Sequence, residues 1–273
     1  MIKKYLIAIY WIACLAACST GKEFYLKTPG ASSQRITGTV FYRTVATWQW
    51  RERDSLAVQE ILSGNIPGFL KKFVPVSSRI TDSTGLVHHA VFYVSPDYLS
   101  IGTNEDWARI PLTPMAAQRI ADRYNCFLPT RKIVDLIYQQ AIVKPEPVPM
   151  SAYRDSSITM WQHHLLIEAQ RKGSKGLIAG IKKDVVISTM VSNNRKPDRV
   201  AIYGWHLPDG KPIQPLYSGH VNWYVDYSHG IRLIYRKIKV DGKEMDYTDV
   251  LKDPLYQALI CDEPPCSYFR YPY

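Results

Sequence analysis

Apolar positions recur with helical spacing in the middle of the chain. Thr113 offers a capping hydroxyl just before a proline, which is typical of a helix start, and apolar residues then share one face through 124. Thr130 opens a second stretch whose apolar residues, from 133 to 141, also share one face. Only a few residues separate the two helices, so they form a tight helical corner. A third helix is predicted over 159–171.

Other parts of the first half read differently. Residues 36–50 are rich in threonine, valine and aromatic residues, which is typical of a strand. Asp54 can cap a short helix that runs to Leu62, and residues 88–99 contain a second strand. The first half is therefore predicted to be mainly helical, with these strands at its start.

The second half has the pattern of antiparallel hairpins. Strands are predicted over 177–187 and 199–206, and Asp209-Gly210 and Asp241-Gly242 are dipeptides that suit tight hairpin turns. The pattern predicts an α+β fold, with a helical first half, a tight helical corner and an antiparallel, hairpin-rich sheet in the second half. We expect residues 35–273 to form a single domain.

The N-terminus has the pattern of an export signal. Lysines at positions 3 and 4 precede an apolar run over 5–13, which is shorter than the roughly 20 residues that a membrane-spanning helix needs. Leu15-Ala16-Ala17-Cys18 resembles the bacterial lipobox. This resemblance implies a signal peptide over 1–17, a lipid on Cys18, a tether over 18–34 and a protein held on a membrane of the cell envelope, facing the periplasm or the exterior. The alternative is an ordinary secretory signal.

Charge and cysteine content fit this location. The formal net charge is +10, and loss of two lysines with the signal peptide leaves 10 − 2 = +8, which favours anionic lipid head groups or envelope glycans as partners. The basic residues are dispersed, so no nucleic-acid partner is expected. Cys261 and Cys266 can close a small loop by a disulfide in an oxidising compartment, although Cys126 can pair with either of them equally well.

Candidate chemistry concentrates between residues 203 and 232. His229 follows Asp226 by three residues, so the two cannot share one face of a regular strand, and we expect a turn or bulge between Asp226 and Gly230. Polar residues here do not follow the period of a strand, which suggests a functional constraint. We predict that His229 is a general base and that Asp226 orients it. The alternative is a polar hairpin face with hydrogen-bonded histidines.

Further residues of this segment are candidates for substrate binding. They are His206, His220, Trp205, Trp223 and Arg232. Aromatic faces suit sugar rings as well as hydrophobic cores, so the crowding of aromatics gives weak support to a glycan or muropeptide cleft.

Cys126 is the candidate nucleophile. It lies four residues before the helix start at Thr130, and the positive end of a helix dipole lowers a thiol pKa. A cysteine on a helical corner followed later by a histidine at a strand start resembles the order in papain-like and NlpC-type cysteine peptidases. The Asp-Cys-Ser-Gly stretch typical of the wall peptidases is replaced here by Tyr124-Asn125-Cys126-Phe127. A buried apolar thiol or a disulfide partner is the alternative.

The same region also allows a zinc site. Ser218-Gly219-His220 followed by Asp226 resembles the Ser-x-His…Asp stretch of zinc D-Ala-D-Ala peptidases, but the spacing is one residue short and no acid-Trp-His stretch follows. His206, His220 and His229 are then the candidate ligands.

These observations give one leading hypothesis and two alternatives. The leading hypothesis is a cell-envelope hydrolase without a resident cofactor, which cleaves amide-type bonds in peptidoglycan-like substrates. The alternatives are a zinc hydrolase and a non-catalytic lipoprotein that binds a glycan or an envelope partner.

Overall fold

The computed structural model describes residues 24–30 and 35–273. The expected signal peptide, the expected lipidation site Cys18 and most of the expected tether lie outside the described residues. Within the described part, no helix is long and apolar enough to cross a membrane.

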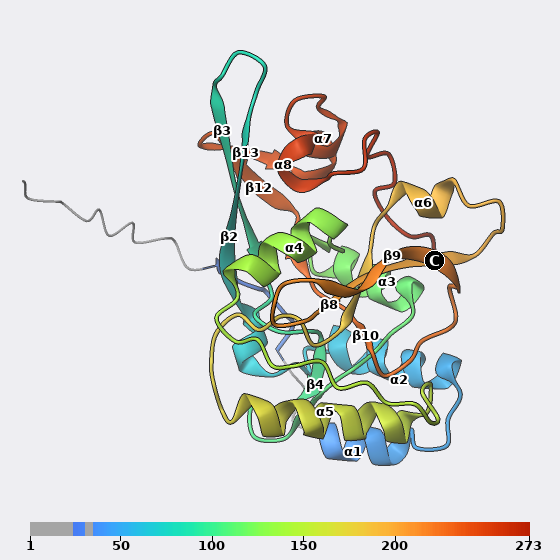
Figure 1. The fold of residues 1–273 in the computed structure, drawn as a ribbon. Helices are drawn as coiled ribbons and strands as arrows, with labels where there is room; N and C mark the ends of the chain where they lie inside the picture. Colours follow the sequence, from blue (N-terminus) through green and yellow to red (C-terminus); the bar gives the residue numbers. More distant parts are fainter. Residues whose placement is uncertain (1–23, 31–34) are drawn as a thin grey trace, which may run out of the picture.

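The described chain contains both helices and strands, as predicted (Figure 1). The helices are α1 (Gly38–Thr44), α2 (Trp50–Leu62), the 3₁₀ helix η1 (Gly68–Lys71), α3 (Pro114–Arg123), α4 (Arg131–Gln140), α5 (Ser157–Arg171), α6 (Thr189–Ser192), α7 (Tyr247–Lys252) and α8 (Gln257–Ile260). The strands are β1 (Phe24–Tyr25), β2 (Lys72–Thr81), β3 (Val87–Val94), β4 (Ser100–Gly102), β5 (Trp107–Arg109), β6 (Cys126–Phe127), β7 (Lys183–Val186), β8 (Arg199–His206), β9 (Pro212–Val221), β10 (His229–Gly230), β11 (Ile234–Tyr235), β12 (Lys237–Val240) and β13 (Lys243–Asp246).

The predicted helical corner is formed by α3 and α4. The hydroxyl of Thr113 accepts a hydrogen bond from the backbone N–H of Ala116, and that of Thr130 accepts one from Ile133. Both side chains therefore satisfy N–H groups that have no partner within their helix. The short strand β6 lies within the link, and Cys126 is buried in the protein interior.

The strand predicted over 36–50 is wrong. This segment forms α1 and the first residue of α2, and the Thr37 hydroxyl caps α1 by accepting from the N–H of Val40. Phe41, Tyr42 and Val45 are buried from one side of the segment. Burial of this apolar face offsets the weak strand preference of the β-branched and aromatic residues.

The larger sheet contains seven strands in the order β1-β2-β3-β11-β6, with β12 paired to β3 and β13 paired to β12. All of its pairings are antiparallel. The long β2–β3 hairpin projects at one end of the molecule, with α7 and α8 beside it, whereas α5 and α1 lie at the opposite end (Figure 1).

The second sheet has the order β10-β7-β8-β9 and carries the candidate chemistry. The β8–β9 hairpin turns at Asp209-Gly210 and the β12–β13 hairpin at Asp241-Gly242, so both predicted turns are confirmed. Strand β10 runs parallel to β7, and this pairing was not predicted. It joins two segments that lie more than forty residues apart in the chain.

One hydrophobic core cluster extends from Leu26 to Tyr271 and includes residues of both sheets. The C-terminal tail joins this core through the Tyr271 hydroxyl, which donates to the Val186 carbonyl and accepts from the Ala201 N–H. A disulfide links Cys261 to Cys266, which is the first of the pairings allowed by the sequence.

Candidate functional site

A cluster of polar and aromatic residues surrounds the start of β10. Its members, called the His229 cluster below, are Arg154, Lys183, His220, Tyr224, Asp226 and His229. The parallel pairing of β10 with β7 places His229 directly opposite Lys183. The remaining members come from β9, from the segment after it and from the residues that precede α5.

The chain turns tightly between Asp226 and His229, as the sequence predicted. The Asp226 carboxylate accepts hydrogen bonds from the N–H of Ser228 at 2.8 Å and from its hydroxyl at 2.5 Å. The N–H of His229 donates to the Asp226 carbonyl at 3.1 Å. Aspartate often forms a turn in this way, because its carboxylate accepts a hydrogen bond from the backbone N–H two residues later in the chain. The turn sends Asp226 and His229 into the same cluster.

Asp226 is buried but held in its charged form. Arg154 donates to its Oδ2 from Nη2 at 3.0 Å and from Nε at 3.2 Å, and the Tyr224 hydroxyl donates at 3.3 Å. Burial opposes ionisation, but nearby His229, the hydrogen bonds from Ser228 and the Lys183 ammonium outweigh it. The pKa of Asp226 therefore lies well below its ordinary value.

His229 is only 1% exposed and its Nε2 atom is buried without a hydrogen-bond partner. Burial lowers its pKa to about 4; Asp226 opposes this shift and Lys183 adds to it. The imidazole is therefore neutral near pH 7 and has the basic nitrogen that proton abstraction needs. Its ring neighbours are His220 and Tyr224, with centroids 6.1 Å and 6.0 Å away.

Strained backbone lies next to the cluster, on β8. The pairing of β8 with β9 is irregular between Ile202 and Gly204, and Trp205 has φ +57°. A positive φ is unusual for a bulky residue and costs about 1–3 kcal/mol, and such strain gathers at functional sites. The Lys183 ammonium lies 5.4 Å from the centre of the Trp205 ring, whose buried Nε1 has no partner.

Lys182 holds the turn from its inner side. Its ammonium donates to the carbonyl of Tyr227, and the next residue along, Lys183, donates its backbone N–H to the carbonyl of Ser228 at 2.7 Å. Lys182 is 1% exposed and also contacts Nδ1 of His163 at 3.2 Å. Burial, assisted by Arg109, lowers the pKa of Lys182 to about 7.

The sequence-predicted substrate residues separate into two groups. His220 belongs to the His229 cluster, the Trp205 ring lies beside the Lys183 ammonium, and Trp223, which precedes Tyr224 in the chain, is half exposed. His206 instead bonds Asp135 of α4 at 3.0 Å and stacks on Tyr138.

Arg232 also lies outside the cluster. It is 1% exposed and donates to the carbonyls of Ser95 and Ile178 at 2.9 Å and 2.7 Å. Its guanidinium also lies over the ring of Tyr98. Arg232 therefore connects the chain segments around Ser95 and Ile178 inside the protein.

Cys126 is placed in the core on β6, opposite Tyr235 of β11. Its thiol contacts the carbonyl of Tyr124 at 3.4 Å, and burial raises its pKa far above the ordinary value of a thiol. The expected helix-dipole activation is absent, because the thiol belongs to a strand in apolar surroundings rather than to the first turn of α4. Cys126 is therefore a buried thiol in apolar surroundings, as in the alternative interpretation of the sequence.

The three histidines of the zinc alternative do not converge. His220 and His229 are neighbours, but His206 is engaged with α4. Over residues 24–30 and 35–273, no group of three or more histidine, cysteine or acidic side chains has a metal-binding arrangement. The zinc alternative therefore lacks its third histidine in this arrangement.

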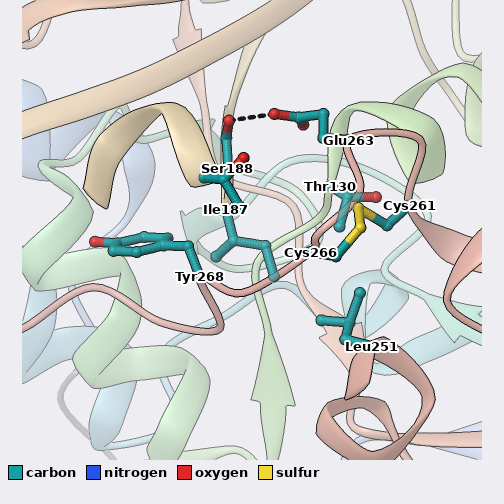
Figure 2. Close-up of a pocket in the computed structure, with 9 residues that line it drawn as sticks. Thr130, Ile187, Ser188, Leu251, Cys261, Glu263, Cys266 and Tyr268 are labelled. Atoms are coloured by element: carbon teal, nitrogen blue, oxygen red, sulfur yellow. Dashed lines mark hydrogen bonds between the residues drawn. A yellow bond between two sulfur atoms is a disulfide. The ribbon is translucent and has the colours of Figure 1, made fainter. Parts of the chain in front are cut away.

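Two small pockets lie elsewhere in the described part of the chain. The first lies beside the Cys261–Cys266 disulfide, where the Ser188 hydroxyl donates to Glu263 at 2.6 Å (Figure 2). The second lies between α4 and β8, with Asp184 and His206 in its lining. Neither pocket is lined by a member of the His229 cluster.

Sequence reasoning missed Lys182, Lys183 and Arg154. Arg154 lies 72 residues before Asp226, and no local pattern connects them. Comparison with known proteins adds no relationship: the chain matches no protein-family model, no curated protein and no solved structure. Its α+β class therefore rests on the structure alone.

Proposed function

We propose that the protein is an exported, lipid-anchored hydrolase of the cell envelope, with His229 as its general base. The observation that carries the proposal is the turn that combines a buried, neutral His229 with a buried, ionised Asp226. Paired titratable groups whose surroundings drive their pKa values apart are typical of acid–base sites. The strained Trp205 beside them adds independent support.

The proposed chemistry is the attack of water on an acyl carbon. The free Nε2 of His229 takes a proton from the water as its oxygen bonds to the acyl carbon, and the imidazolium that results is stabilised by the negative charge of Asp226. The imidazolium then gives this proton to the leaving amide nitrogen as the C–N bond breaks, which releases an amine and a carboxylic acid and returns His229 to its neutral form. Lys183 and Arg154 supply positive charge for the oxyanion that develops on the substrate. The proposed substrate is peptidoglycan-like material, in which the protein would cleave amide-type bonds. This choice follows from the expected location in the cell envelope, where such material is found.

Cys126 has no role in this proposal. A thiol that is buried and has a raised pKa carries almost no thiolate near pH 7, and thiolate is the nucleophilic form. Direct attack by water needs only the base and the cationic groups of the cluster. The proposal therefore replaces the covalent mechanism suggested by the peptidase resemblance.

Two features support export. The Cys261–Cys266 disulfide is typical of proteins that leave the reducing cytosol. The lipobox-like Leu15-Ala16-Ala17-Cys18 supplies the expected anchor. The Cys18→Ser variant should lose membrane retention or processing in a bacterial host, and normal retention in the membrane fraction would refute the anchor.

The burial of His229 favours a second candidate, a binding protein without catalysis. Since His229 is 1% exposed, a substrate must displace groups around the imidazole, whose ring neighbours are His220 and Tyr224, to reach Nε2. A protein that only binds envelope material has no need of this access, and the aromatic and cationic groups of the cluster suffice for it.

One experiment separates these candidates. Full-length protein in detergent is incubated with isolated peptidoglycan, and released fragments and new amino groups are measured by mass spectrometry and amine labelling. His229→Ala should lower the rate by about 10²–10⁴-fold. The exposed His89, which lies on β3, provides the matched control His89→Ala, which should keep the full rate.

The pH dependence gives a further check. Since the pKa of His229 is about 4, protonation of its imidazole should leave the wild-type rate unchanged down to about pH 5 and should lower the rate below that. Equal rates for wild type and His229→Ala would refute catalysis by His229. Binding to peptidoglycan without any release of fragments would favour the binding protein.

A further inference from the structure

A line of rings connects solvent to His229. Tyr217 of β9 is 44% exposed, and its ring centroid lies 5.1 Å from that of His220. His220 lies 4.8 Å from Tyr224, which in turn lies 6.0 Å from His229. The line therefore runs from a ring that is nearly half exposed, through two partly buried rings, to a buried imidazole.

Gly219 determines where the outermost ring lies. A Cβ atom at this position would be 2.1 Å from the hydroxyl oxygen of Tyr217 and 2.3 Å from its Cζ. The ring can therefore lie across the backbone only because residue 219 has no side chain. The φ of Gly219 lies outside the left-handed region, so alanine fits the backbone and only the Tyr217 ring must move.

The surface around Tyr217 combines apolar faces with hydrogen-bond donors. Ile213 lies four residues before Tyr217 on the edge strand β9 and is 40% exposed, while Trp223, which precedes Tyr224 in the chain, is 50% exposed. Arg199 lies at the same place and donates to the carbonyl of Gly219 at 3.0 Å. Its Nε is buried and has no partner.

We propose that this surface is a carbohydrate subsite, in which Tyr217 stacks against a sugar ring of a peptidoglycan glycan strand. A pyranose ring has an apolar face of C–H groups, which packs on an aromatic ring, and a rim of hydroxyls, which bonds to donors such as Arg199 and His220. The exposed face of an edge strand suits an extended chain. The choice of a peptidoglycan glycan rests on the proposed function. The inference adds to that function by naming a part of the substrate that the protein binds away from the bond that is cleaved.

The test uses full-length protein in detergent and the β-1,4-linked tetramer of N-acetylglucosamine as the probe. Binding is measured by calorimetry. Tyr217→Ala should weaken binding about tenfold, whereas Tyr217→Phe, which keeps the ring, should change it less than about threefold. Gly219→Ala keeps the tyrosine but displaces its ring, so it should weaken binding nearly as much as Tyr217→Ala. Trp48 is 40% exposed before α2, and Trp48→Ala is the control that should bind normally.

The outcomes also separate this inference from the proposed function. Unchanged binding in Gly219→Ala and Tyr217→Ala would overturn the subsite, even if His229→Ala abolishes hydrolysis. Wild-type affinity for a glucose tetramer but not for the N-acetylglucosamine tetramer would overturn the choice of peptidoglycan. Binding that depends on Tyr217, found in a protein that hydrolyses nothing, would keep the subsite and refute the hydrolase. Thermal unfolding of each variant checks that the fold is intact.

Discussion

Replacing Asp226 by asparagine removes one buried charge and leaves the side chain almost the same size. The Asp226 carboxylate accepts four hydrogen bonds from Ser228 and Arg154 and a fifth from Tyr224. An asparagine has one acceptor oxygen, which can serve the buried Ser228, and its amide group then points its own donors toward Arg154. The variant therefore loses the charge-assisted bonds on one side and gains a contact between two donors.

The size of the effect follows from the burial of each partner. Breaking a buried ion pair costs about 3–5 kcal/mol. Asp226 is 1% exposed, but the Arg154 side chain is 41% exposed and can turn to water, so the lower end applies. We expect Asp226→Asn to lower the free energy of unfolding by about 3 kcal/mol at pH 7. The melting temperature should fall by about 6–12 °C for a chain of this size.

The same reasoning fixes the pH dependence. The folded-state pKa of Asp226 lies below its unfolded value of about 3.9. The stabilisation is therefore complete above that unfolded value, and it is lost as the pH falls toward the folded-state pKa. The difference in stability between wild type and Asp226→Asn should stay constant from pH 7 to 5 and shrink by pH 3.

Urea unfolding followed by tryptophan fluorescence at pH 7, 5 and 3 measures this difference. The neighbouring Asp155 is exposed, so Asp155→Asn makes the same chemical change and should leave stability within about 0.5 kcal/mol of wild type. A loss below about 1 kcal/mol for Asp226→Asn at pH 7 would refute the reasoning, since that is the range of an exposed ion pair. So would a difference that is as large at pH 3 as at pH 7.

Three further predictions concern groups around and beyond the cluster. Lys182→Met removes the ammonium that donates to Tyr227, so kcat should fall with little change in KM, as steady-state kinetics would show; a change in KM alone would contradict this. Cys126 is buried and should resist iodoacetamide in the folded protein but react in urea, as mass spectrometry would show; labelling of the folded chain would contradict its placement. Cys261 and Cys266 close a short loop, and replacing both by serine should cost about 2 kcal/mol in urea unfolding; unchanged stability would show that the loop is held by other contacts.

The parts of the fold that the sequence predicts are those with a local physical cause. Thr113 and Thr130 are caps because their hydroxyls satisfy N–H groups within three residues. The Asp209-Gly210 and Asp241-Gly242 turns were predictable because glycine tolerates a positive φ. Residues 36–50 were misassigned because the burial that decides their conformation comes from distant parts of the chain, which composition does not reveal.

The same distinction explains the candidate site. The irregular chain between Asp226 and Gly230 follows from spacing alone, since an aspartate and a histidine three residues apart cannot share a strand face. Lys183 reaches His229 only because β10 pairs in parallel with β7, and parallel pairing leaves no turn signal in the sequence. The burial of Cys126 was equally hidden, because a cysteine before a helix has the same local sequence whether it is exposed or buried.

The His229 cluster therefore depends on contacts that are local in the sequence and on contacts that the packing of the sheet brings together. Mutation can test the two kinds of contact separately. One part of the Asp226–His229 turn is local: Ser228 bonds to the Asp226 carboxylate within two residues, and these bonds should persist in any variant that keeps both residues. The cationic surroundings depend on the packing of the sheet, because Lys183 arrives with β7. A substitution that loosens β7 should therefore preserve the Asp226–Ser228 bonds but separate the Lys183 ammonium from the imidazole. If His229 is the base, such a variant should keep its fold but change its pH profile, because Lys183, one of the charges that lower the pKa of His229, comes from outside the turn.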